Sequence, residues 1–382
     1  MKKKILFVIT QFYKGGAEMA LLNLLKNLSP EEYEVDLLIH DQVYISGYVC
    51  LIDKLPSWVR VCNASQGEMQ LIAYGKKAIK KLVLRITKSL ISRVTAKEFV
   101  KGKHYDIAFN YGEWMPPEFV ACEVQADRKY NWVHGDLDKV EYLDPKVFFA
   151  WDKYYDGYIF VSESSMRDSC DAYPILNGRC RVINNMCNEE EIRVLASEPV
   201  GIPRVEGKHL LVTVANFRQQ KNHLRQLEVM RILKSRGYNI LWLNIGGNAD
   251  INLLTKLKRR IKEYELDDAF ILMDSNPNPY KYMVRADAIP VLSDSESWSM
   301  VITEAKILGI PVIATPTSGA LEQIKHGENG LIVEPDAEKI AEAIGNYLDD
   351  ISLQKRLREN LKGYSQAKHT LNQWTKLIGG GQ

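Results

Sequence analysis

The stretch DAIPVLSDSESWSMVITEAKILGIPVIATP, residues 287–316, contains two strand-like runs separated by a helix-like segment. The runs DAIPVLS (287–293) and IPVIATP (310–316) are short and apolar, which is typical of buried strands. A strand, a helix and a second strand form a right-handed unit whose two strands are parallel. The loop after the first run is therefore expected at the carboxyl edge of a parallel sheet, where such folds bind ligands.

Two glutamates in this stretch, Glu296 and Glu304, need an explanation. Glu296 falls in the loop after the first strand, and Glu304 lies about two turns into the following helix. The helix dipole alone would explain a carboxylate at Glu296. Glu304 neighbours Val301, Ile302 and Ala305. An inward-facing carboxylate there needs partners, because burying an unpaired charge costs several kcal/mol, and ligand hydroxyl groups would supply them.

The alternation of strand and helix patterns extends over both halves of the chain. Further strand-like runs occupy 5–10, 34–40, 105–111, 129–136, 155–162, 179–185, 209–216, 239–247 and 268–274. The proline- and glycine-containing stretch 196–208 lacks periodicity and is interpreted as a linker. We predict an α/β protein with two Rossmann-like parallel-sheet domains that face each other across a cleft, at 1–195 and 209–365. The segment 366–382 is predicted as a helix that packs back on the N-terminal domain.

Composition narrows the class of protein. The chain has 382 residues, enough for two domains, and its 46% hydrophobic content suits a soluble protein with full cores. A net charge of +2 gives no indication of nucleic-acid binding. The six cysteines include no C-x-x-C pair, which favours a reducing compartment. No apolar run has the length of a membrane span, so we predict a cytoplasmic protein.

One segment, 76–103, is strongly basic, with ten Lys and Arg residues and the single acid Glu98. Its apolar residues recur at helical spacing on one face. A basic amphipathic helix of this kind can bind an anionic membrane surface. The alternative is an ordinary surface helix with a solvated basic face, and the sequence does not choose between the two.

Other candidate positions follow predicted strands. In KGGAE (14–18), Gly15 and Gly16 permit close approach of a ligand to the backbone at a helix start, which attracts anions. The alternative is an ordinary turn between a strand and a helix, which would have the same sequence pattern. His134 follows the run ending in NWV and could bond a sugar hydroxyl or serve a structural role. The triplet from Asp136 to Asp138 is a D-x-D, which some metal-dependent transferases use and which also arises by chance.

Two cations, Arg218 and Lys221, follow the first strand of the second half. Arg can grip a diphosphate with two hydrogen bonds and Lys acts as a point charge, whereas the alternative is a pair of solvated surface charges. In ESWSM, residues 297–300 would begin a helix whose free amide groups point toward the ligand edge.

Taken together, these pieces resemble the retaining glycosyltransferases of family four, which have the GT-B fold. The residues that carry the resemblance are GGAE at 15–18, RQQKN at 218–222, AD at 286–287, the pair Glu296 and Glu304, EAKILGIPVIAT at 304–315, and SGALEQI with HGENGLIV within 318–333. Two departures are the pattern VANF where the family often has VGRL, and ESWS in place of EGFG.

The resemblance implies a role for each matching residue. Glu304 would bind the ribose hydroxyls of the nucleotide and Glu296 the donor sugar. Arg218 and Lys221 would neutralise the leaving diphosphate in place of a metal, so no metal or other cofactor is expected. His134 would lie near the reacting carbon. The donor would also be lined by Gly16, Trp298, Ser299, Met300 and Val301, and the acceptor by Gly15 and Gly16.

The implied reaction transfers a sugar, with retention of configuration, from a nucleoside diphosphate-sugar, most simply a UDP-sugar, to a hydroxyl group. The expected acceptor is a saccharide or lipid-linked saccharide of bacterial surface polysaccharide synthesis, at the inner face of the cell membrane. Two alternatives keep the fold. One is a UDP-sugar 2-epimerase, which would need no acceptor, and the other is a non-catalytic nucleotide-binding protein. A nicotinamide dehydrogenase would need a glycine fingerprint that this sequence lacks.

Overall fold

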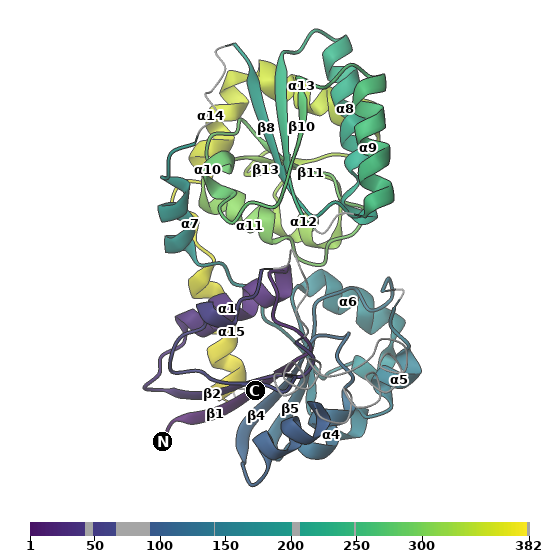
Figure 1. Cartoon of the computed structure of the whole chain (residues 1–382). Coiled ribbons are helices and arrows are strands. Elements are labelled where there is room, and N and C mark those ends of the chain that lie inside the picture. Colours follow the sequence, from purple (N-terminus) through teal and green to yellow (C-terminus); the bar gives the residue numbers. More distant parts are fainter. Residues whose placement is uncertain (43–48, 66–91, 141, 201–206, 248–249, 380–382) are drawn as a thin grey trace, which may run out of the picture. The chain divides into compact units, whose positions relative to one another are not determined.

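The computed structural model describes residues 1–42, 49–65, 92–140, 142–200, 207–247 and 250–379. The chain divides into two compact units, which are considered one at a time (Figure 1). Residues 1–186 and 370–382 make up the first unit, and residues 187–369 make up the second. The larger part of the basic segment, 76–91, lies outside the described residues.

The first unit is built on a seven-stranded sheet in which every strand is parallel to its neighbours. Its order is β3-β2-β1-β4-β5-β6-β7. The strands are β1 (Lys3–Ile9), β2 (Tyr33–Ile39), β3 (Arg60–Asn63), β4 (Tyr105–Tyr111), β5 (Ala126–Val133), β6 (Gly157–Phe160) and β7 (Cys180–Val182). Its helices include α1 (Gly16–Asn27), α4 (Glu118–Glu123), α5 (Pro145–Phe149) and α6 (Glu163–Ala172).

The last helix, α15 (Ala367–Gly379), belongs to the first unit from Thr370 onward. Its Trp374 is buried and stacks against Phe7 of β1, with ring centroids 6.1 Å apart. Arg128 of β5 donates to the carbonyl oxygens of the helix's last turn, which have no partner inside the helix. An aromatic contact and a cationic cap therefore hold this helix to the sheet.

The second unit contains two three-stranded parallel sheets. One has the order β10-β9-β8 and the other β11-β12-β13. Their strands are β8 (His209–Val214), β9 (Ile240–Ile245), β10 (Phe270–Met273), β11 (Ile289–Val291), β12 (Val312–Ala314) and β13 (Gly330–Ile332).

The two sheets meet along β8 and β11. Leu211 forms a parallel bridge with Ala288, and the Thr213 hydroxyl donates to the carbonyl of Pro290 at 3.1 Å. Pro290 has no N–H to contribute to a strand ladder, so the junction has few backbone bonds. The six strands have the order of a doubly wound sheet, β10-β9-β8-β11-β12-β13. The sequence order of the strands along the sheet reverses between β8 and β11, although all of them are parallel.

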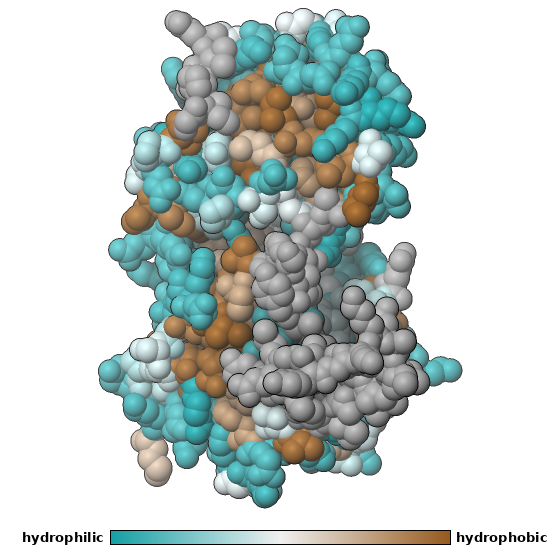
Figure 2. Space-filling view, viewed as in Figure 1, coloured by the Kyte–Doolittle hydropathy of each residue, from teal (hydrophilic) through white to brown (hydrophobic). Residues whose placement is uncertain are grey.

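Helices cover both faces of this combined sheet. The core on one face joins strand residues to α8 (His223–Ser235), α9 (Ile251–Glu263) and α13 (Ala337–Asp349). The core on the other face includes residues of α10 (Tyr280–Met283), α11 (Met300–Ile307) and α12 (Ser318–Gln323). The α9 helix buries Leu253, Leu257 and Ile261, and its outer side forms hydrophilic surface (Figure 2). This apolar stripe with a charged opposite side is the pattern of a helix packed on one face.

The boundary between the units differs from the expected one at 195. The helix α7 (Glu189–Ala196) lies in the second unit, where Ile192 packs with Cys187 and with Ile307 of α11. Asn278 also donates to the carbonyl of Leu195 at 2.8 Å. These contacts place residues 187–195 with the second unit. The remaining helix of that unit is α14 (Ile351–Asn360).

Candidate functional site

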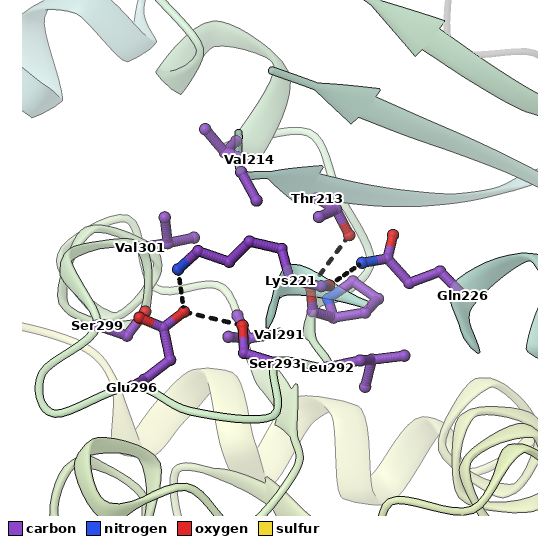
Figure 3. Close-up of a pocket in the computed structure, with 12 residues that line it drawn as sticks. Thr213, Val214, Lys221, Gln226, Val291, Leu292, Ser293, Glu296, Ser299 and Val301 are labelled. Carbon is purple, nitrogen blue, oxygen red and sulfur yellow. Dashed lines mark hydrogen bonds and ion pairs between the residues drawn. The ribbon is translucent and has the colours of Figure 1, made fainter. Parts of the chain in front are cut away.

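A pocket in the second unit opens at the carboxyl ends of β8 and β11 (Figure 3). Its lining residues are Thr213, Val214, Ala215, Lys221, Gln226, Pro290, Val291, Leu292, Ser293, Glu296, Ser299 and Val301. Because the strand order reverses between β8 and β11, the pocket lies at the switch point of the sheet. Ligands of doubly wound folds bind at this position.

An ion pair crosses the pocket. Lys221 Nζ lies 2.5 Å from Glu296 Oε1, and the Ser293 hydroxyl donates to the same oxygen at 2.8 Å (Figure 3). The Lys221 and Glu296 side chains are 23% and 13% exposed, so the pair is mostly shielded yet reachable from solvent. A partly shielded cation and carboxylate can bind a diphosphate and a hydroxyl group respectively. The structure thus brings together Lys221 and Glu296, for which the resemblance implies roles at the leaving diphosphate and at the donor sugar.

The loop after β8 is fastened to the loop after β11. Asn222 has a left-handed backbone (φ 53°), and its amide nitrogen contacts both oxygens of Asp294 at 2.7 and 2.6 Å. Arg225 adds an ion pair to Asp294 at 2.8 Å. These contacts fix Lys221, which directly precedes Asn222. Arg218 is exposed and is absent from the pocket lining, so the two predicted cations occupy different settings.

Glu304 lies deeper in α11 and away from the pocket lining. Its Oε1 accepts a hydrogen bond from the Tyr280 hydroxyl at 3.0 Å. Burial, followed by the charge of Glu304, raises the pKa of Tyr280, so this phenol stays protonated and can donate. Tyr280 therefore supplies one of the partners that the sequence argument required for Glu304.

The amide groups before α11 are only partly available, which corrects one expectation. Ser299 is the N-cap of α11, and its N–H already donates to Gln323 Oε1 at 3.0 Å. The Ser299 N–H therefore bonds within the protein and is not available to a bound nucleotide-sugar. Val301 lines the pocket, whereas Met300 packs in the apolar cluster of Cys187 and Ile307. Trp298 is partly buried and is not among the lining residues.

In the first unit, Gly15 and Gly16 lie where α1 begins, after the strand at which that sheet's order reverses. Gly15 is the N-cap, and a Cβ there would lie 2.3 Å from Glu18 Oε2, so glycine leaves room for this carboxylate. Burial raises the pKa of Glu18 to about 7. The Tyr111 hydroxyl, from the end of β4, donates to the Ala17 carbonyl at 3.1 Å and ties β4 to this turn.

His134 directly follows β5, as predicted, in an aromatic environment. Its ring centroid is 4.7 Å from that of Tyr111, and both ring nitrogens are buried without a hydrogen-bond partner among the described residues. Desolvation lowers the pKa of His134 to about 3. The backbone N–H of His134 donates to Glu113 at 2.8 Å, and the Tyr142 hydroxyl donates to the same carboxylate at 2.7 Å. The structure therefore places a neutral imidazole at a strand end.

The two aspartates of the D-x-D triplet have different environments. Asp136 is buried and pairs with Lys139 at 3.2 Å, whereas Asp138 is exposed. Within the described part of the chain, no group of three or more His, Cys, Asp or Glu side chains is arranged to hold a metal ion. Nor do those same residues include a helix with the length and apolar character of a membrane span.

Comparison with known proteins identifies the second unit. Residues 198–364 match the family model described as glycosyl transferases group 1. This segment is a glycosyl transferases group 1 domain. It contains the pocket, the Lys221–Glu296 pair and Glu304, so every contact of the switch-point site described above belongs to the matched domain.

Curated relatives of the glycosyltransferase domain cover parts of the chain. An N-acetylgalactosaminyltransferase of Campylobacter jejuni, whose name specifies a diphospho-undecaprenol substrate, is 26% identical over 54% of this chain and 54% of its own length. The capsular polysaccharide biosynthesis glycosyltransferase CapM of Staphylococcus aureus is 29% identical over 35% of each chain. The chain thus spans about half or less of the length of these relatives.

Solved structures resemble the whole chain. Anabaena HepE in complex with UDP superposes with a TM-score of 0.74 at 18% identity, covering 100% of both chains. This likeness shows the fold, and the α/β prediction of a GT-B protein with two Rossmann-like parallel-sheet domains is confirmed.

Sequence reasoning missed several side chains that organise these sites. Glu113 follows β4 by two positions, so the rule that polar residues after parallel strands gather at one edge would have found it. Glu18 lies inside the KGGAE turn, but the sequence pattern alone assigns it no role. Tyr280 and Gln323 contact α11 from other elements, and no local pattern marks either one.

Proposed function

We propose that the chain is a retaining glycosyltransferase of family four that transfers a sugar from a UDP-sugar to a hydroxyl acceptor. The observation that carries the proposal is the Lys221–Glu296 pair at the switch point of a glycosyl transferases group 1 domain. The name of a solved structure with the same fold includes UDP, which supports a uridine nucleotide as the donor's leaving group.

The protein's own groups would perform the transfer by binding and charge stabilisation. Lys221 would bind the leaving diphosphate with Arg218 from the exposed loop, so that no metal is needed. The Glu296 carboxylate would accept hydrogen bonds from hydroxyl groups of the donor sugar, and the Ser293 hydroxyl would hold that carboxylate in place. Glu304 would bind the ribose hydroxyls, its other side held by Tyr280.

The first unit would supply the acceptor side. His134 is held neutral by burial, so its imidazole can both donate and accept a hydrogen bond with a sugar hydroxyl. The Gly15–Gly16 turn would allow a ligand to approach the backbone of α1 closely. The relatives named for an undecaprenol-linked substrate and for capsular polysaccharide support a saccharide or lipid-linked saccharide acceptor, used in bacterial surface polysaccharide synthesis.

The donor site is tested by thermal shift with UDP, GDP, ADP, NAD and a set of UDP-sugars, on wild type and on Glu304→Ala. A ligand at about a hundred times its dissociation constant adds roughly 2.7 kcal/mol to stability. We expect UDP to stabilise the wild type and to lose most of that effect in Glu304→Ala, because the ribose loses its carboxylate partner. Glu342→Ala, which removes an exposed carboxylate of α13, should respond to UDP as the wild type does.

The outcomes separate the rival functions. Equal UDP stabilisation of the wild type and Glu304→Ala would contradict the ribose-binding role. Stabilisation by NAD alone would contradict the transferase proposal. Conversion of a UDP-sugar into its 2-epimer without any acceptor would favour the epimerase instead.

We also propose peripheral attachment to an anionic membrane through the basic segment 76–103. We expect wild type to float with vesicles containing phosphatidylglycerol and not with pure phosphatidylcholine, because lysines near an anionic surface each contribute about 1 kcal/mol. Charge reversal should abolish flotation when applied to Lys76, Lys77, Lys80 and Lys81. Unchanged flotation of this variant would rule out the attachment.

A further inference from the structure

The short helix α12 holds the segment 296–299 at two points. At its start, the Gly319 N–H donates to the carbonyl of Glu296 at 2.7 Å. A Cβ at Gly319 would lie 2.9 Å from that same oxygen, so the close approach requires glycine. At its end, the Gln323 side chain contacts Ser299. The segment that carries Glu296 and leads into α11 is therefore fixed by α12 on both sides.

The Gln323 side chain bonds the backbone of Ser299 in both directions. Its Oε1 accepts from the Ser299 N–H at 3.0 Å, and its Nε2 donates to the Ser299 carbonyl at 3.0 Å. The same Nε2 donates to the Thr303 hydroxyl at 2.8 Å. Gln323 and Ser299 are both buried, so these bonds are shielded from water. Paired bonds of this kind fix the direction of a backbone segment as well as its position.

Lys306 supports Gln323 from the neighbouring helix. Its ammonium group donates to the Gln323 carbonyl at 2.7 Å and lies 4.3 Å from the centroid of the Tyr364 ring. Burial lowers the pKa of Lys306 to about 8, so most of it remains charged near neutral pH. The charge-assisted bond and the ring contact together hold the end of α12 against α11.

The consequence concerns the amide groups that follow Ser299. With the Ser299 N–H bound to Gln323, the first turn of α11 begins at Met300 and Val301, whose N–H groups precede the intrahelical ladder. The orientation of these amides is set by the Ser299 backbone. We propose that Gln323 is a positioning residue that aims the first turn of α11 at the diphosphate of the donor. This inference rests on the proposed function.

The test compares UDP with uridine, because uridine lacks the diphosphate but keeps the base and ribose. Calorimetry gives both dissociation constants for wild type and for Gln323→Met, which keeps the side chain's length and removes its hydrogen bonds. We expect the UDP dissociation constant to rise about tenfold, the size of one charge-assisted contact, with that of uridine unchanged. A variant that merely loosened the unit would weaken both ligands together.

Two control variants change residues close to Gln323, one in α11 and one in α12. Thr303→Val removes the third partner of Gln323 without touching Ser299, and Leu321→Ala alters an exposed residue of α12. Both should keep the wild-type ratio of the two constants within about twofold. If Gln323→Met does not fold, Gln323→Glu is measured instead. It keeps an acceptor for the Ser299 N–H and loses the amide donors, so the UDP dissociation constant is expected to rise by less than in Gln323→Met, again with that of uridine unchanged.

An unchanged ratio in a folded Gln323 variant, with wild type binding UDP, would overturn the positioning role and leave the proposed function intact. A wild type that binds neither UDP nor any other nucleoside diphosphate would overturn both. A UDP-specific loss confined to the Gln323 variants is the result that supports the inference.

Discussion

Substitution of Lys221 by alanine is expected to raise the dissociation constant of UDP about tenfold or more. It should also slow cleavage of the bond between the sugar and the diphosphate about 10²–10³-fold. The first figure is the size of one lost charge-assisted contact, and the second is typical of removing one preorganised group that stabilises developing charge. Lys221 Nζ is the cation that the fold fixes at the switch point, 2.5 Å from Glu296. Arg218 stands on the exposed part of the loop and replaces little of it.

The effect of Lys221→Ala has two sources that a double-mutant cycle separates. The substitution removes a cation from the diphosphate, and it also leaves the Glu296 carboxylate with the Ser293 hydroxyl as its remaining hydrogen-bond partner among the described residues. Combining Lys221→Ala with Glu296→Gln removes that leftover charge. The affinity for UDP should stay low in the double variant, because the diphosphate still lacks its cation and UDP carries no sugar for Glu296 to bind. Lys355→Ala, on the exposed side of α14, is the matched control. Turnover of Lys221→Ala within about twofold of wild type would exclude the proposed role.

The repeated alternation of apolar strands and helices was sufficient to predict the fold class, because each buried parallel strand is a continuous apolar run. Two strands were missed, β3 and β13. Each lies at the edge of its sheet and pairs with one neighbour only, and β13 has just the three residues Gly330–Ile332. Their sequences, RVCN and GLI, offer two apolar residues each, which is too short a run to show a strand pattern.

The site could be predicted only where chain order decides which residues meet. Lys221 and Glu296 each follow a strand that ends at the switch point, so the sheet topology alone brings them together. Gln323 reaches Ser299, 24 positions away, because of how α12 packs on α11, and its sequence gives no sign of this. The difference between the expected boundary at 195 and the division after Met186 has a similar cause, because the sequence of α7 does not show which unit it packs against.

The second large effect is a loss of stability of the first unit in acid, caused by His134. Desolvation lowers the folded-state pKa of His134 to about 3, while an unfolded histidine titrates near 6.5. Between these two values the unfolded chain binds more protons than the folded unit. The stabilisation is therefore complete above about pH 6.5 and falls with decreasing pH by up to roughly 1.4 kcal/mol per unit.

The variant His134→Phe isolates this term, since it keeps a ring against Tyr111 and Trp114 but removes both nitrogens. Unfolding is followed as a function of pH in both proteins, and the difference between the curves is taken. Burial also lowers the pKa of His40, but that residue is present in both proteins and cancels. From pH 6.5 to pH 5 the variant should gain about 2 kcal/mol relative to wild type. Parallel curves, or protonation of the His134 ring above pH 5 by NMR, would show that the imidazole is solvated. The neutral side chain proposed for the acceptor hydroxyl depends on that burial.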